Sequence, residues 1–121
     1  MAERLKPDIC VIGAGSGGLS VAAAAAQFGV DVVLIEKGRM GGDCLNTGCV
    51  PSKAMIASAK RAQNMRDANQ FGIASARPRI DPGAVHDHVH GVIGAIAPLD
   101  SVERFTGLGV HVIEAEGRFA D

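Results

Sequence analysis

Residues 8–18 read Asp-Ile-Cys-Val-Ile-Gly-Ala-Gly-Ser-Gly-Gly, and this stretch decides the fold. Its first five residues form a short, largely apolar run typical of a strand buried on both faces, so we expect a central strand of a parallel sheet. Small helix formers over residues 19–28 predict a helix that packs closely on that sheet and stops at Gly29. Residues 31–36, Asp-Val-Val-Leu-Ile-Glu, predict a second buried strand. Strand, helix and strand together indicate a right-handed βαβ unit and an α/β fold.

The rest of the chain extends this unit with a helical excursion and a final pair of strands. Glycines over residues 37–48 predict a loop whose backbone approaches another group closely. One helix is expected with Pro51 in its first turn and its body over about residues 52–70, and another from Pro82 to about residue 96 with Asp81 as its N-cap. Residues 107–119 alternate apolar and polar side chains, so we expect an exposed hairpin there.

Length and composition exclude several classes of protein. The chain has 121 residues, enough for one domain, and its 47% apolar and 21% charged residues exclude general disorder. A formal net charge of -1 gives a polyanion no net attraction, so a nucleic acid partner is not expected. The longest apolar run, residues 19–26, is far shorter than the about 20 residues of a membrane helix. The first residues carry no signal or transit peptide, so the expected location is the cytoplasm.

Gly13, Gly15 and Gly18 stand between the first strand and the first helix, in the order of a dinucleotide-binding loop. Such glycines allow a tight turn, a close approach of the backbone to a pyrophosphate, and contact between helix and strand. Glu36 ends the second strand 18 residues after Gly18, where its carboxylate can accept hydrogen bonds from ribose hydroxyls and would repel a 2′-phosphate. NAD and FAD share this ADP portion, so the loop by itself leaves the choice between them open.

The cysteine segment, residues 41–53, reads Gly-Gly-Asp-Cys-Leu-Asn-Thr-Gly-Cys-Val-Pro-Ser-Lys. It closely resembles the redox-active segment of the pyridine nucleotide-disulfide oxidoreductases, the flavoenzyme family of dihydrolipoamide dehydrogenase, glutathione reductase and mercuric reductase. The resemblance also covers the βαβ unit and, more loosely, residues 109–119. It implies that Cys44 exchanges with substrate, that Cys49 packs against the flavin, and that Lys53 lies near the flavin ring.

The resemblance also implies a reaction and a wider architecture. Electrons would pass from NAD(P)H through FAD to a Cys44–Cys49 disulfide, and from there to a disulfide or metal-ion acceptor. Residues 1–121 would form the N-terminal part of an FAD-binding Rossmann-like domain in a homodimer. The NAD(P)-binding domain, and the dimerisation domain with the His-Glu pair that a partner subunit donates, are absent from this chain, so we expect these 121 residues alone to be inactive. The residues assigned to FAD in this way are Gly13, Gly15, Ser16, Gly17, Gly18, Glu36, Lys37, Gly42, Asp43, Cys44 and Lys53, and none is assigned to a metal.

The residues themselves agree with a paired role for the two cysteines. In a regular helix, positions five apart lie about 8.7 Å from Cα to Cα, whereas a disulfide needs roughly 4.4–6.8 Å. The segment must therefore leave helical geometry if Cys44 and Cys49 are to bridge, and Gly48 can best absorb that departure. A following helix N-terminus and the ammonium of Lys53 both stabilise a thiolate, so we expect Cys49 to ionise readily.

Several alternatives remain open at this point. Asp43 replaces a threonine and Thr47 a valine that are common in the family, which leaves the subfamily open. The chain could instead be a truncated FAD-binding module without catalysis, or an NAD-binding domain whose cysteines sense redox state. A zinc site of the two cysteines with His86 and His90 is disfavoured by the 36 residues between the pairs, and we assign the histidines to a solvated helix face. Cys10, inside the first strand, is expected to be buried and inert.

Overall fold

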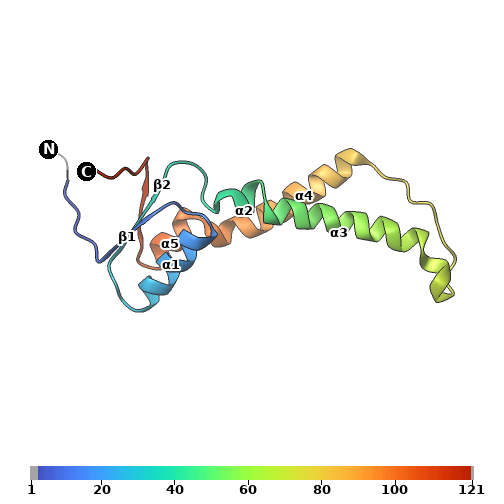
Figure 1. The fold of residues 1–121 in the computed structure, drawn as a ribbon, viewed down its shortest axis with the longest axis horizontal. Helices are drawn as coiled ribbons and strands as arrows, with labels where there is room; N and C mark the ends of the chain where they lie inside the picture. The colour runs from blue at the N-terminus through green and yellow to red at the C-terminus, as the bar shows by residue number, and fades with distance from the viewer. Residues whose placement is uncertain (1–2, 121) are drawn as a thin grey trace.

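The computed structural model describes residues 3–120 and is built on a three-stranded parallel sheet (Figure 1). The strands are β1 (Ile9–Ile12), β2 (Val32–Glu36) and β3 (His111–Glu114), in the order β1-β2-β3. Ile12 pairs with Ile35 and Glu36 pairs with Glu114, so the carboxyl ends of the three strands lie at one edge of the sheet. The expected α/β fold with a parallel sheet is confirmed.

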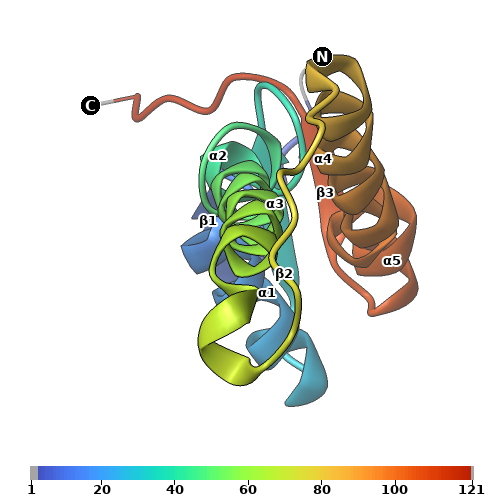
Figure 2. The same ribbon diagram turned by 90° about the vertical axis from the view of Figure 1, so that its right-hand side faces the viewer.

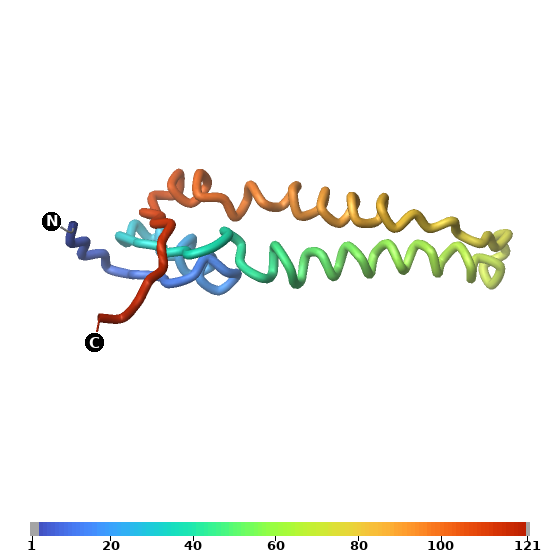
Figure 3. The backbone as a smooth tube through the Cα atoms, turned by 90° about the horizontal axis from the view of Figure 1, so that it is seen from above, coloured from blue at the N-terminus to red at the C-terminus, as the bar shows by residue number. Residues whose placement is uncertain are grey.

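Helices cover the sheet and extend beyond it. They are α1 (Ser16–Gln27), α2 (Gly42–Asn46), α3 (Cys49–Arg66), α4 (Pro82–Ile96) and α5 (Val102–Gly107), with the short 3₁₀ helices η1 (Ala68–Phe71) and η2 (Ala97–Asp100). Helices α1 and α5 pack against the strands, whereas α3 and α4 contact each other and run away from the sheet (Figure 1 and Figure 3). Viewed along their length, these two helices lie side by side (Figure 2). The molecule is therefore a small α/β body from which a long helical hairpin projects.

The hydrophobic core lies on one face of the sheet. Val32 and Leu34 of β2 are fully buried there and pack with Ala22 of α1 and Phe105 of α5. Helix α1 ends where the sequence predicts, since Gly29 adopts the left-handed conformation with φ +74° directly after the capping residue.

The first strand differs from its prediction, because β1 is an edge strand of this sheet and only half of its side chains are partly covered. Ile9 and Val11 pack against the core, whereas Cys10 and Ile12 alternate to the opposite face and are exposed. Within residues 3–120, β1 is therefore not the central strand that the sequence predicts, and the prediction that Cys10 is buried is also wrong. An apolar run by itself does not show which of its two faces will be covered.

The last segment also differs from its prediction. Residues 107–119 contain one strand, β3, which pairs in parallel with β2, so the predicted hairpin is wrong. Helix α5 directly precedes this strand and is capped by the Ser101 hydroxyl oxygen, which accepts the Arg104 N–H at 3.2 Å. Alternation over a few residues is the same in a hairpin strand and in the edge strand of a parallel sheet, so the pattern did not distinguish them.

The two long helices confirm the helical excursion, but one of them ends earlier than expected. Helix α4 begins as predicted, because an Asp81 carboxylate oxygen accepts two backbone N–H groups of its first turn at 2.9 and 3.2 Å. Helix α3 begins at Cys49, so that Pro51 lies in its first turn as predicted, and it ends at Arg66, shortly before η1. The prediction of one continuous helix to about residue 70 is therefore wrong at its C-terminal end.

Gly18 marks the close approach between α1 and the loop after β1. A Cβ atom at this position would lie 1.9 Å from the Gly13 carbonyl oxygen and 3.1 Å from a methyl carbon of Val11. No side chain fits at such distances, so this contact between helix and strand requires glycine.

We predict that Gly18→Ala destabilises the chain by about 1–3 kcal/mol, because the loop and the helix must separate to admit the methyl group. Gly17→Ala is the matched control, since a Cβ on Gly17 would meet no atom within 4 Å and alanine favours a helix. The free energy of unfolding from urea denaturation measures both effects. Equal stability of the two variants would contradict the close contact.

Candidate functional site

The glycine loop between β1 and α1 presents a helix N-terminus without a side-chain cap. Gly15 is the N-cap residue, and Ser16 and Gly17 follow it as exposed residues of the first turn. The backbone N–H groups of this turn are therefore available to an anion, and the dipole of the 12-residue helix adds partial positive charge.

Glu36 at the end of β2 connects the sheet to this loop. Its Oε2 accepts the Ala14 N–H and its Oε1 accepts the Gly38 N–H, both at 2.6 Å. The carboxylate is half-buried, whereas the neighbouring Lys37 is exposed. Because a carboxylate offers about four acceptor positions, Glu36 keeps capacity for hydroxyl donors after these two bonds. The sequence analysis assigned Glu36 to ribose and missed this contact with the loop.

A hollow of about 310 Å³ opens next to Glu36, at the carboxyl edge of the sheet. Gly13 lines it from the end of β1, Glu36 and Lys37 from the end of β2, and residues 115–117 from the segment after β3. Ligands of parallel sheets bind at this edge. Residues 115–117 were not predicted for this site, because the sequence pattern placed them in a hairpin. A third parallel strand would have placed them beside Glu36.

The cysteine segment is bonded directly to the glycine loop. The Gly41 N–H donates to the Ala14 carbonyl oxygen at 2.9 Å. Gly42 lies against the loop, since a Cβ atom on it would be 2.7 Å from the Gly15 Cα. Asn46, which the sequence analysis did not single out, closes the segment by donating from Nδ2 to the Gly42 carbonyl oxygen at 2.8 Å. The candidate anion site and the cysteines therefore form one connected unit.

Cys44 and Cys49 meet across a break between two helices. Cys44 lies in α2, Cys49 is the first residue of α3, and Cys49 is near enough to raise the pKa of the Cys44 thiol. The break falls at Gly48, which has φ −118° and ψ −105°, and a Cβ atom there would lie 2.9 Å from the Asp43 carbonyl oxygen. The predicted departure from helical geometry at Gly48 is confirmed. Both cysteines are free thiols, Cys44 half-buried and Cys49 exposed.

The surroundings of Cys44 favour the protonated form of its thiol. Interaction with the Cys49 side chain, together with partial burial and the negative charge of Asp100, raises the pKa of Cys44 above its usual value. Since the thiolate is the nucleophile in disulfide exchange, Cys44 needs a higher pH, or a base that removes its proton, to react.

A second hollow, of about 300 Å³, lies beside Cys44. Ser16 lines it from α1, while Asp100 and Arg104 bring two opposite charges from η2 and α5. A hydrogen bond from the Arg104 guanidinium to the Leu99 carbonyl oxygen, at 2.5 Å, holds this side chain. The sequence analysis missed Asp100 and Arg104, because no local motif marks them and only the fold brings them near Cys44.

The other residues predicted for the flavin site lie at the surface around this unit. Asp43 is exposed in the first turn of α2, and Lys53 is exposed on α3, one turn beyond Cys49. The structure thus brings most of the predicted site residues into one connected region and leaves the ammonium of Lys53 in solvent.

Metal ligands do not gather at this site. Within residues 3–120, no three His, Cys, Asp or Glu side chains converge where they could hold a metal ion, so the zinc alternative with two cysteines and two histidines does not form. In the same part of the chain, no helix combines the length and the apolar character that crossing a membrane requires.

Known proteins resemble this chain across almost its full length. The family model described as pyridine nucleotide-disulphide oxidoreductase matches residues 7–120. The dihydrolipoyl dehydrogenase of Haloferax volcanii is 41% identical over 115 residues, which cover 94% of this chain and 24% of that protein. The mercuric reductase of Streptomyces lividans is 34% identical over 119 residues, with the same 94% and 24% coverage.

The chain spans about a quarter of the length of these curated relatives. Within that quarter, the match includes the glycine loop, Glu36 and the cysteine segment, which are the parts that the structure joins. The chain therefore belongs to the pyridine nucleotide-disulphide oxidoreductase family.

Proposed function

We propose that this chain is the FAD-binding, redox-active part of a flavin-dependent oxidoreductase. Electrons would pass from NAD(P)H through FAD to the Cys44–Cys49 pair, and then to a disulfide or metal-ion acceptor. The observation that carries the proposal is the hydrogen bond from Gly41, beside the thiols, to Ala14 in the glycine loop, because it joins a nucleotide site to a dithiol. The names of the relatives, dihydrolipoyl dehydrogenase and mercuric reductase, support the two acceptor classes. A homodimer and a cytoplasmic location remain predictions.

The residues around the glycine loop fit FAD. The free N–H groups at the start of α1 would bind the pyrophosphate, and the hollow beside Glu36 would take the adenosine. The remaining acceptor positions of Glu36 would receive the ribose hydroxyls, and its negative charge disfavours a phosphate there. Bound FAD would supply the electron-transfer chemistry that amino-acid side chains lack.

The thiol pair would carry the electrons onward by disulfide exchange. Reduction of a Cys44–Cys49 disulfide to two thiols takes up two electrons and two protons. The Cys44 thiolate then attacks a disulfide substrate and one substrate thiolate leaves; the Cys49 thiolate attacks the Cys44 sulfur, releases the second substrate thiolate and restores the disulfide. Because the pKa of Cys44 is raised, a base that takes its proton would speed this attack.

The hollow beside Cys44 is the proposed acceptor site. Cys44 forms part of its wall, and its volume of about 300 Å³ suits a small molecule. Asp100 and Arg104 place one negative and one positive charge on the same wall. This combination favours a polar acceptor over a purely apolar one.

The first prediction concerns the nucleotide. The apoprotein should bind FAD, and Glu36→Gln should weaken binding by about 1–3 kcal/mol, roughly 5-fold to 150-fold, because it removes the charge that receives the ribose hydroxyls. Glu114→Gln is the matched control, since Glu114 pairs with Glu36 in the sheet but is exposed and does not line the hollow. Quenching of FAD fluorescence during titration measures the affinity. Equal weakening in both variants would show that Glu36 does not bind the ribose. Binding of NAD in place of FAD would favour the alternative of an NAD-binding domain that senses redox state.

The second prediction concerns the ionisation of Cys44. The charge of Asp100 helps to raise the pKa of Cys44, so Asp100→Asn should lower this pKa and shift the pH profile of Cys44 alkylation towards acid. Glu103→Gln removes an exposed acid from the first turn of α5 and should leave the profile unchanged. Iodoacetamide labelling of the reduced protein, followed by peptide mapping, gives the rate at Cys44. An unchanged profile in Asp100→Asn, or the same shift in both variants, would contradict the assignment.

A further inference from the structure

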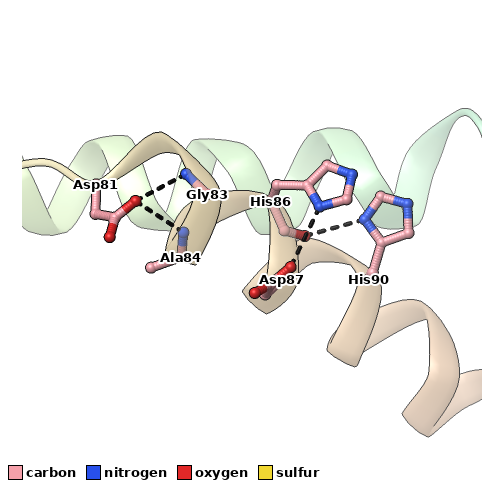
Figure 4. Close-up of polar contacts among 6 residues, drawn as sticks. All are labelled: Asp81, Gly83, Ala84, His86, Asp87 and His90. Carbon is pink, nitrogen blue, oxygen red and sulfur yellow. Dashed lines mark hydrogen bonds and ion pairs between the residues drawn. The ribbon is translucent and has the colours of Figure 1, made fainter.

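Two histidine rings stack on the surface of α4, outside the thiol site. His86 and His90 are one helical turn apart, where side chains share a face. Their ring centroids lie 4.0 Å apart and the ring planes are tilted by 31° (Figure 4). The sequence analysis assigned both to a solvated helix face, and the stacking adds a relation between the rings that spacing alone does not give.

The hydrogen bonds of the two rings fix where their lone pairs lie. His90 Nδ1 is 3.0 Å from the His86 carbonyl oxygen, which can only accept, so this nitrogen carries the proton. His86 Nδ1 faces an Asp87 carboxylate oxygen at 3.4 Å, a longer contact with the same consequence. In each neutral ring the other nitrogen, Nε2, is then unprotonated, and Figure 4 shows these nitrogens facing away from the two acceptors.

This arrangement is the one that metal-binding histidines adopt. Such residues donate their second ring N–H to a carboxylate or a backbone carbonyl, which fixes the tautomer and the direction of the ring. Residues four apart on a helix share one face, so the Nε2 atoms of the two rings can converge on one ion once the rings turn out of their stacked arrangement. The His86 side chain is 66% exposed, which gives an ion access and leaves its other coordination positions to water.

We propose that His86 and His90 form a two-histidine binding site for a divalent transition-metal ion of the class that imidazole suits, namely copper, nickel or zinc. The neighbouring Asp87 carboxylate adds a negative charge that favours a cation. Since no third His, Cys, Asp or Glu converges on the pair within residues 3–120, the site is bidentate. Copper(II) binds more tightly than nickel(II) or zinc(II), following the usual order of divalent ions. A bound ion bridges one turn of α4 and stabilises that helix.

Nickel(II) binding to the chain tests this proposal. The background carries Cys10→Ser, Cys44→Ser and Cys49→Ser, so that the thiols do not compete for the ion. Equilibrium dialysis should find one nickel ion per chain, and His86→Gln or His90→Gln should each weaken binding at least about tenfold. His88→Gln is the matched control, because His88 lies on α4 between the two residues but outside the stacked pair, and it should bind as the parent does.

Two further readouts keep the test independent of variant folding. In the parent chain, paramagnetic nickel should broaden the ring NMR signals of His86 and His90 before those of His88 and His111. The melting temperature should rise with nickel in the parent and in His88→Gln, because an ion that binds only the folded helix stabilises it. Absence of nickel binding, unchanged affinity in His90→Gln, or an equal loss in His88→Gln would overturn the proposal.

Discussion

The backbone of Ala14 is bonded on both sides, and the site depends on these two bonds. Its N–H donates to the Glu36 carboxylate at 2.6 Å, and its carbonyl oxygen accepts the Gly41 N–H at 2.9 Å. The first bond ties the glycine loop to the end of β2, and the second ties it to the segment that carries the thiols. Ala14 is fully buried, so both of its backbone groups need these partners. The glycine loop and the cysteine segment are therefore positioned by the same residue.

The two thiols differ because the fold gives them different surroundings. Cys49 is exposed at the start of α3. Cys44 is half-buried in α2 and lines a hollow that Asp100 also lines. The nearby Cys49 side chain, aided by the charge of Asp100, raises the pKa of Cys44. In the proposed reaction this asymmetry leaves the proton on the thiol that meets the acceptor, so that exchange depends on a base.

The features that the sequence predicts correctly are those that depend on interactions between residues close together in the chain. The strand ending at Ile12, the helix stop at Gly29, the N-cap at Asp81 and the break at Gly48 follow from residue types whose backbone preferences act within a few positions. The parallel pairing of β3 with β2, the exposure of Cys10 and the charges beside Cys44 depend on segments far apart in the chain. No pattern within one segment contains that information, which is why the hairpin was predicted and Asp100 was missed.

The central claim is that the Cys49 thiol lies against bound flavin while Cys44 faces the acceptor. The most direct measurement is the absorption spectrum of the intact, flavin-loaded protein after anaerobic reduction of its disulfide. A thiolate in contact with oxidised flavin adds a long-wavelength band. The account predicts that this band persists in Cys44→Ser and is lost in Cys49→Ser. Loss in Cys44→Ser with retention in Cys49→Ser would contradict it.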